Sequence, residues 1–329
     1  MALQQAWLRR GATATALWPV SLLYRAVVSL RRSAYRAGLL RTTRIARPVI
    51  VVGNVVAGGA GKTPVVIALV NHLRRRGIPA GVISRGYGRA TRDCREVRAN
   101  SAAADSGDEP LLIARATGVP VVVAPRRAEA ARALLDRHPD VQLIVCDDGL
   151  QHLALARDLE ICVFDARGTG NGWLLPAGPL REPWPRVVDF ILHPPERAML
   201  GGLAIQRRLA SHAVDGDGRR IPLASLRGQR ATAMAAIAQP QRFFDMLRGE
   251  AGIELSECIA LPDHADLSRW QPPAGVLLCT EKDAVKLWPH HRQALAVPLE
   301  VEIEPAFWAA LDAWLDQRSL SSAHGHQTD

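Results

Sequence analysis

The stretch GNVVAGGAGKTP, residues 53–64, holds residue types that bind phosphate. Lys62 can reach the β and γ phosphates of ATP, the hydroxyl of Thr63 can bind Mg²⁺, and backbone N–H groups of a glycine-rich loop can surround phosphate oxygens. The phosphate-binding pattern G-x-x-x-x-G-K-[ST] begins with a glycine, whereas this chain has Val56 at that position. The alternative is a glycine-rich turn that binds nothing. We expect the nucleotide-binding residues to be Val56, Ala57, Gly58, Gly59, Ala60, Gly61, Lys62 and Thr63.

Two pairs of acidic residues could hold a metal ion or accept a proton. Asp147 and Asp148, in CDDGLQH (146–152), follow an apolar run, and an aspartate at a strand end can hold the Mg²⁺ shell. Taken alone, they also fit a solvated turn. Asp108 and Glu109 begin a helical pattern, where acids complement the helix dipole. A kinase also needs a base near the acceptor hydroxyl, and a carboxylate beside a histidine can serve.

Three further features have both a chemical and a purely structural interpretation. His264, in LPDHADL, is a candidate partner for a carboxylate but also fits a surface turn. The Gly- and Pro-rich stretch 171–183 carries Arg181 and Glu182 and is either flexible or shaped around a ligand. In so arginine-rich a chain, we expect lysine where a compact ammonium is needed. The lysines of the chain are Lys62, Lys282 and Lys286.

The elements that must position these residues alternate between short apolar runs and longer helical patterns. Strands are predicted at 48–55, 81–86, 119–125, 141–148 and 159–166, and helices at 62–77, 108–117 and 126–137. Such alternation predicts an α/β fold of the P-loop NTPase type, with a mainly parallel sheet and flanking helices. The glycine-rich loop falls between the first strand and its helix, where nucleotide phosphates bind in such sheets.

The pattern changes near residue 203. Alternating polarity on both sides of a DGDG sequence predicts an antiparallel two-stranded connector. We therefore expect a P-loop kinase domain over residues 46–202, the connector over 203–229 and a smaller C-terminal α/β lobe over 230–329, with a cleft between the lobes.

Charge is concentrated at the N-terminus. Residues 1–47 hold nine arginines and no acidic residue, which leaves 32 basic and 32 acidic residues in the rest of the chain. This balance argues against a nucleic-acid-binding body. The five cysteines show no C-x-x-C spacing, which is typical of reduced thiols in the cytoplasm.

The basic arm, residues 1–45, contains an amphipathic pattern. Residues 18–41 place apolar side chains at helical spacings opposite an arginine-rich face. The uncharged run 11–24 is too short to cross a bilayer, so we expect the helix to lie in the membrane interface. Anionic phospholipid would attract its arginines. The alternative is an ordinary helix that packs on the protein's own core.

Taken in order, these motifs resemble the tetraacyldisaccharide 4'-kinase family, the lipid A 4'-kinases of Gram-negative bacteria. The resemblance covers nearly the whole chain. It rests on VVGNVVAGGAGKTP, SRGYG, GDEP, CDDGLQH, GNGWLLPAGPLREP, LPDH and TEKDAVK, in that order. The family's loop has the form N-x-x-x-G-G-x-G-K-T-P, so the resemblance makes Val56 a family trait.

The resemblance implies transfer of the γ-phosphate of ATP to the 4'-hydroxyl of a tetraacylated glucosamine disaccharide 1-phosphate, at the cytoplasmic face of the inner membrane. It implies a base at Asp108 with His264 as its partner, and catalytic cations at Lys62 and Arg181. Members often carry a second histidine where this chain has Ala265. The residues that match metal positions are Thr63, Asp147, Asp148, Glu109 and Glu182. Those that match positions lining the active site are Arg127, Gln151 and His152.

Two other functions are open. One is a P-loop kinase that acts on a different lipid or sugar acceptor. The other is a nucleotide-dependent switch, or a partition-type ATPase, tethered to the membrane by the N-terminal arm. A switch would hydrolyse ATP without an acceptor. Neither a nucleic acid nor an obligate protein partner is expected.

Overall fold

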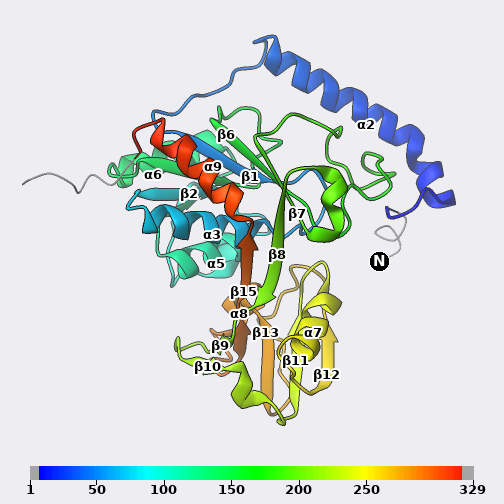
Figure 1. Cartoon of the computed structure of the whole chain (residues 1–329), viewed down its shortest axis with the longest axis vertical. Helices are drawn as coiled ribbons and strands as arrows, with labels where there is room; N and C mark the ends of the chain where they lie inside the picture. Colours follow the sequence, from blue (N-terminus) through cyan, green and yellow to red (C-terminus); the bar gives the residue numbers. More distant parts are fainter. Residues whose placement is uncertain (1–6, 321–329) are drawn as a thin grey trace, which may run out of the picture.

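The computed structural model describes residues 7–320 and arranges them around two β-sheets (Figure 1). The first six residues of the expected N-terminal arm and the last nine of the expected C-terminal lobe lie outside this range. Within residues 7–320 the larger sheet has nine strands and the smaller sheet has six.

The larger sheet is parallel except at its two edges. Neighbouring strands pair in parallel from β8 through β4, whereas β15 and β3 pair antiparallel at the edges. This arrangement confirms the predicted fold class. In spatial order the strands are β15 (Leu299–Ile303), β8 (Leu203–Leu209), β7 (Phe190–His193), β6 (Leu159–Val163), β1 (Val49–Gly53), β5 (Leu143–Asp147), β2 (Ala80–Ser84), β4 (Val121–Val123) and β3 (Arg95–Val97).

Helices cover both faces of this sheet, so its central strands are buried on both sides. Alternate residues of β1 point to opposite faces: Ile50 and Val52 join one hydrophobic core, and Val49 and Val51 join the other. The first core includes α3 (Lys62–Arg75) and α5 (Asp108–Thr117), and the second includes α6 (Arg127–Arg137). A short helix, α4 (Ala103–Ser106), precedes α5, and a 3₁₀ helix, η1 (Pro195–Leu200), follows β7.

The smaller sheet forms a second unit with its own core. Its strands, in spatial order, are β10 (Arg220–Pro222), β9 (His212–Val214), β14 (Leu295–Val297), β13 (Val276–Thr280), β11 (Ala231–Ala235) and β12 (Leu255–Ala260). Helices α7 (Pro240–Gly249) and α8 (Glu281–Leu287) and the 3₁₀ helix η2 (Leu223–Leu226) pack around it.

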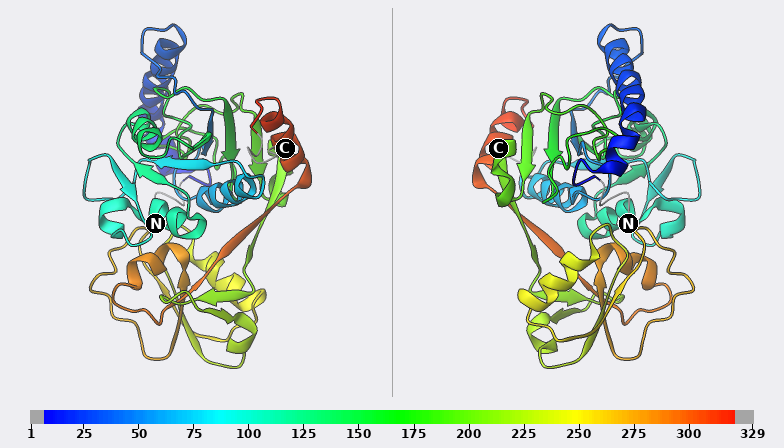
Figure 2. Two further views of the ribbon diagram at one scale, coloured as in Figure 1. Left: turned by 90° about the vertical axis from the view of Figure 1, so that its left-hand side faces the viewer. Right: turned by 90° about the vertical axis from the view of Figure 1, so that its right-hand side faces the viewer.

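The connection between the two sheets differs from the expected local hairpin. Strand β8 pairs antiparallel with β15, from Leu209↔Leu299 to Ile205↔Ile303, and these two strands run from one sheet to the other (Figure 2). The hairpin around the DGDG sequence is instead β9–β10, at the edge of the smaller sheet. Local alternation shows that a segment forms a strand, but it does not show a partner about 90 residues away.

The last helix also leaves the expected C-terminal lobe. Helix α9 (Pro305–Asp316) follows β15 back to the larger sheet, where Phe307, Leu311 and Leu315 share a core with Leu69 and Leu73 of α3. The smaller unit is therefore held to the larger one at both of its chain ends, by β8 and β15.

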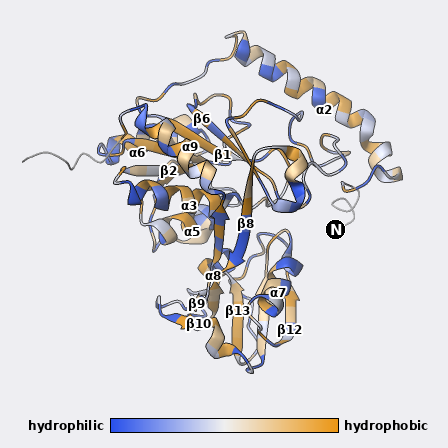
Figure 3. Cartoon of the chain, viewed as in Figure 1, coloured by the Kyte–Doolittle hydropathy of each residue, from blue (hydrophilic) through white to orange (hydrophobic). Residues whose placement is uncertain are grey.

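Helix α2 (Ala12–Arg36) lies along the outside of the larger unit, with an apolar face on the surface (Figure 3). The side chains of Leu23, Val27 and Leu30 are 65–72% exposed. Among residues 7–320, α2 is the one helix that is long and apolar enough to cross a membrane by length and composition, and 11% of its apolar window is buried. It is therefore not an ordinary core helix.

Candidate active site

The glycine-rich loop lies between β1 and α3, as the pattern predicts. Gly58 and Gly61 adopt φ values of +94° and +71°, which favour glycine. The side-chain amide of Asn54 donates to the backbone oxygen of Val56 at 2.7 Å and fixes the first turn. Val56 is buried and forms an antiparallel bridge with Leu180. This backbone bridge joins the loop to the 171–183 stretch, and the side chain of Val56 shares a buried hydrophobic cluster with Leu180. A valine therefore fits where the usual pattern has glycine.

Two cations hold Asp148 in front of the loop. The Nη1 atom of Arg181 lies 3.0 Å from both carboxylate oxygens of Asp148, and the Nζ atom of Lys62 lies 3.6 Å from one of them. Burial opposes ionisation of Asp148, but the charges of Lys62 and Arg181 outweigh burial and lower its pKa. Asp148 is therefore a carboxylate at neutral pH, next to the phosphate-binding lysine.

Asp147 is the buried member of the acid pair. Burial, together with the negative charge of Glu109, raises its pKa to about 7. One of its oxygens accepts a hydrogen bond from Ser84 at 3.2 Å, while Oδ1 has no hydrogen-bond partner among the described residues. The unpaired Oδ1 atom of Asp147 lies near the negative charges of Glu109 and Asp148, and a bound cation would stabilise this arrangement.

Thr63, Glu109 and Asp148 line the same cleft, and Asp147 precedes Asp148 at the end of β5, so these four residues remain the candidates to hold Mg²⁺. Residues 7–320 contain no preformed cluster of three or more metal-ligating His, Cys, Asp or Glu side chains. Mg²⁺ commonly uses one or two protein carboxylates, with water and phosphate oxygens at its other positions, so its site need not be such a cluster.

A carboxylate and a histidine from different units meet at the opposite wall of the site. The Nδ1 atom of His264 lies 3.2 Å from Oδ2 of Asp108, and the Nζ atom of Lys286 lies 3.3 Å from the same oxygen. Lys282 approaches Nε2 of His264 at 3.1 Å. Burial opposes ionisation of Asp108, but the hydrogen bond from His264 and the two ammonium groups together lower its pKa. Both lysines of TEKDAVK are therefore part of this cluster.

A cleft of about 1120 Å³ separates the phosphate loop from the smaller unit. Residues 57–64 line one side, and His264, Lys282 and residues 237–239 line the other. Glu109, Asp148 and Arg181 also line it. The volume is sufficient for a nucleotide together with part of a second substrate.

Three predicted lining residues lie outside the cleft lining, and one of them supports the acid pair. Arg127 is buried and donates to the backbone oxygens of Asp147 and Asp148 at 3.3 and 3.1 Å. Gln151 donates to the backbone oxygen of Asn54 at 2.9 Å. Burial and the charges of neighbouring arginines, Arg127 first among them, lower the pKa of His152 to about 4, so this imidazole is neutral at pH 7.

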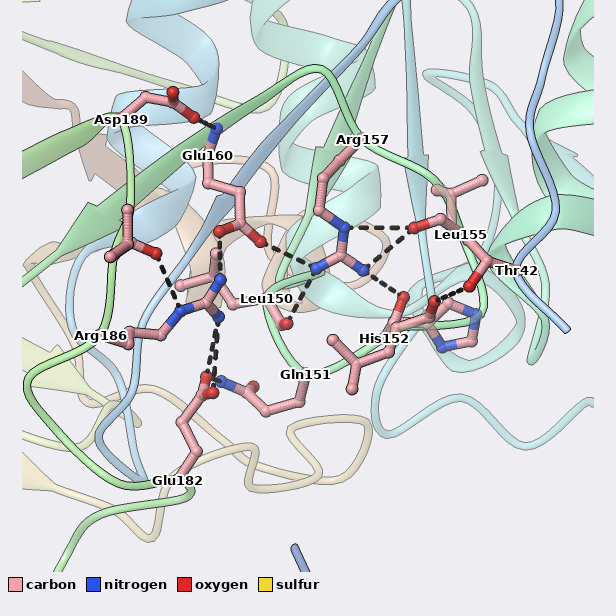
Figure 4. A network of polar contacts seen from close by, with 12 residues as sticks. Thr42, Leu150, Gln151, His152, Leu155, Arg157, Glu160, Glu182, Arg186 and Asp189 are labelled. Carbon is pink, nitrogen blue, oxygen red and sulfur yellow. Dashed lines mark hydrogen bonds and ion pairs between the residues drawn. The ribbon is translucent and has the colours of Figure 1, made fainter. Parts of the chain in front are cut away.

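Glu182 does not join the predicted metal acids. Its carboxylate is buried and accepts hydrogen bonds from Gln151 at 2.8 Å, from Arg186 at 3.3 Å and from Arg32 at 3.2 Å. Figure 4 shows Glu182 beside Gln151 and Arg186, in a network of polar contacts that continues to Glu160. These three donors satisfy the hydrogen-bonding capacity of the Glu182 carboxylate without a metal ion.

Two arginines that contact the loop were not predicted from the sequence. Arg207 of β8 donates to the backbone oxygen of Ala60 at 2.9 Å. Arg167 donates to the backbone oxygens of Ala57 and Gly59 at 3.3 and 3.2 Å. Neither residue belongs to a motif, and an arginine-rich chain gives no reason to single them out.

A glycine-rich loop that faces an acid–histidine pair across a cleft, on a mainly parallel sheet, places the protein among the P-loop phosphotransferases. A model of the family described as tetraacyldisaccharide-1-P 4'-kinase matches residues 13–316. The chain belongs to this family, as the ordered motifs indicate.

Full-length relatives support this membership. A tetraacyldisaccharide 4'-kinase of Acidovorax ebreus (strain TPSY) is 61% identical, over 98% of this chain and 96% of the relative. A tetraacyldisaccharide 4'-kinase of Leptothrix cholodnii is 47% identical, over 92% of this chain and 90% of the relative. A crystal structure of LpxK from Aquifex aeolicus in complex with ATP superposes with a TM-score of 0.81 at 28% identity, and covers 92% of this chain and 98% of that one.

Proposed function

We propose that this protein transfers the γ-phosphate of ATP to the 4'-hydroxyl of a tetraacylated glucosamine disaccharide 1-phosphate. The observation that carries the proposal is the position of His264, which lies within hydrogen-bond distance of Asp108, across the cleft from Lys62 and Thr63. A switch ATPase needs the phosphate loop and its metal acids, but it has no use for a base aimed at an acceptor hydroxyl.

In the proposed reaction, the acceptor oxygen attacks the γ-phosphorus while the bond to the β–γ bridging oxygen breaks and ADP leaves. The hydroxyl proton passes to the carboxylate of Asp108. His264 and Lys286 hold this carboxylate in place and keep it ionised. A low pKa suits a loose transition state, in which the base takes the proton late and positioning matters most.

Cations neutralise the charge on the transferring group. Lys62 reaches the phosphates, and the N–H groups of the loop surround their oxygens. Thr63, Asp147, Asp148 and Glu109 would hold Mg²⁺, which supplies further positive charge to the phosphates. Arg181 fixes Asp148 through both carboxylate oxygens, so its role is to orient that acid.

The lipid substrate places the enzyme at a membrane. Its acyl chains stay in the bilayer, so the enzyme must come to the lipid. We infer that α2 binds the cytoplasmic face of the inner membrane through its exposed apolar face, with its arginines near anionic phospholipid. This corresponds to peripheral or monotopic attachment.

ATP consumption with and without acceptor separates the kinase from the alternatives. We expect ADP release to require the tetraacyldisaccharide 1-phosphate and to match it one to one. Equal ADP release without any lipid would favour the tethered ATPase, and selective use of another sugar lipid would favour a kinase for a different acceptor.

A further inference from the structure

The inner face of α2 is bound to the loop that carries Arg181 and Glu182. The hydroxyl of Ser21 donates to the backbone oxygen of Leu174 at 2.9 Å. The hydroxyl of Tyr24 donates to the backbone oxygen of Arg181 at 2.8 Å. These two residues lie three positions apart and therefore share one side of the helix, opposite the exposed Leu23.

The third contact from α2 is an ion pair with the buried carboxylate of Glu182. Nη1 of Arg32 lies 3.2 Å from Oε2 of Glu182, whose side chain is 4% exposed. Glu182 also pairs with Arg186, which in turn pairs with Glu160, and Glu160 pairs with Arg157. Charges thus alternate in sign from α2 into the protein, and much of this chain of contacts is drawn in Figure 4.

The same contacts continue to both sides of the phosphate site. Gln151 donates to Glu182 and to the backbone oxygen of Asn54, and Asn54 donates to the backbone oxygen of Val56 in the loop. In the other direction, Arg181 adjoins Glu182 in sequence and holds both oxygens of Asp148. Displacement of Glu182 would therefore disturb the loop and the metal acids together.

We propose that α2 is a positioning element of the phosphotransfer site as well as a membrane-binding helix, and that Arg32 and Tyr24 are its positioning residues. Contact of α2 with the lipid surface and the geometry of the Arg181–Glu182 segment are then coupled. Coupling of this kind is reciprocal, so the correct geometry of the Arg181–Glu182 segment also favours contact of α2 with the lipid surface. The inference rests on the proposed function, because its readout is phosphotransfer.

The test compares two arginines of α2 that differ in their contacts. Arg32 is paired with Glu182, whereas Arg36 is exposed and has no ion-pair partner among the described residues. Each is replaced by glutamine, which removes the same charge from the same helix. Vesicles that contain the lipid substrate and anionic phospholipid are titrated until all of each variant is bound, and kcat is measured there.

When all of the protein is bound to vesicles, the kcat of Arg32→Gln should still be about tenfold below that of the wild type. Small displacements at a phosphotransfer site lower the rate by one to two orders of magnitude. Any loss in Arg36→Gln should follow its loss of vesicle binding and disappear at saturation. Arg32→Lys should recover part of the rate. Equal kcat values for wild type and Arg32→Gln at saturation would overturn the inference.

Two further variants keep the test decisive if Arg32→Gln folds poorly. Tyr24→Phe removes one hydroxyl and should lower kcat severalfold at unchanged vesicle affinity. In a Glu182→Gln background, Arg32→Gln should have little further effect, because the ion pair is already gone. Full additivity of the two changes, or a normal kcat for Tyr24→Phe, would contradict the inference. If the wild type makes no phosphorylated lipid, the proposed function itself fails.

Discussion

Asp108 and His264 lie 3.2 Å apart although 156 residues separate them in the chain. Asp108 begins α5 of the larger unit, and His264 follows β12 of the smaller unit, where it adopts a φ of +62°. The pair therefore forms only when the two units face each other across the cleft. Lys282 and Lys286 come from the smaller unit as well and bring positive charge to the same place.

Replacement of Asp108 by asparagine removes the proposed base and keeps its shape. We expect Asp108→Asn to lower kcat by two to four orders of magnitude, the usual range of about 10²–10⁴ for general-base catalysis. ATP affinity, measured by titration calorimetry, should change little, because Asp108 does not contact the phosphate loop. Asp105→Asn, at a half-exposed site on the neighbouring α4, is the matched control. Near-normal turnover of Asp108→Asn would exclude the proposed base.

Asp147 should make the metal-free protein less stable as pH rises. Its pKa is raised from 3.8 to about 7, so the folded state keeps a proton that the unfolded state loses between these values. Stability is therefore lost as pH rises from about 4 to 7 and stays low above 7. Asp147→Asn cannot ionise, so without Mg²⁺ it should be more stable than the wild type at pH 8, by roughly 4 kcal/mol.

Chemical denaturation at pH 4.5 and pH 8 measures this difference, which should be small at the lower pH. Addition of Mg²⁺ and ATP at pH 8 should then stabilise the wild type more than Asp147→Asn. A variant that is less stable than the wild type at pH 8 without metal would show that Asp147 is not a strained buried charge.

The exposed apolar face of α2 should carry membrane affinity. Replacement of Leu23, Val27 and Leu30 by serine removes apolar surface without touching the contacts to the 171–183 stretch. We expect the affinity for anionic vesicles, measured by co-sedimentation, to weaken about 150-fold, because each of the three side chains contributes about 1 kcal/mol. Val187→Ser and Met199→Ser, at exposed sites outside α2, are the controls. Unchanged co-sedimentation of the triple variant would rule out α2 as the membrane anchor.

The sequence allowed the larger sheet, the phosphate loop and the acid pair to be predicted because each depends on local pattern. A buried β1, glycines at Gly58 and Gly61, and Asp147 at a strand end follow from neighbouring residues. The pairing of β8 with β15 could not be predicted, because it joins segments from opposite ends of the smaller unit.

The position of Glu182 shows a different limit. The family resemblance implied a metal ligand at Glu182, yet its oxygens are taken by Gln151, Arg186 and Arg32. A chain with 41 lysines and arginines offers many partners to one carboxylate, and the choice among them is made by tertiary packing.

Product analysis tests the central claim most directly. Purified full-length protein is incubated with ATP, Mg²⁺ and tetraacyldisaccharide 1-phosphate, and the lipid is examined by mass spectrometry with fragmentation and by ³¹P NMR. We predict a lipid that has gained one phosphoryl group, located on the 4'-oxygen of the distal glucosamine, in an amount equal to the ADP formed. An unmodified lipid alongside continued ATP hydrolysis would contradict the assignment.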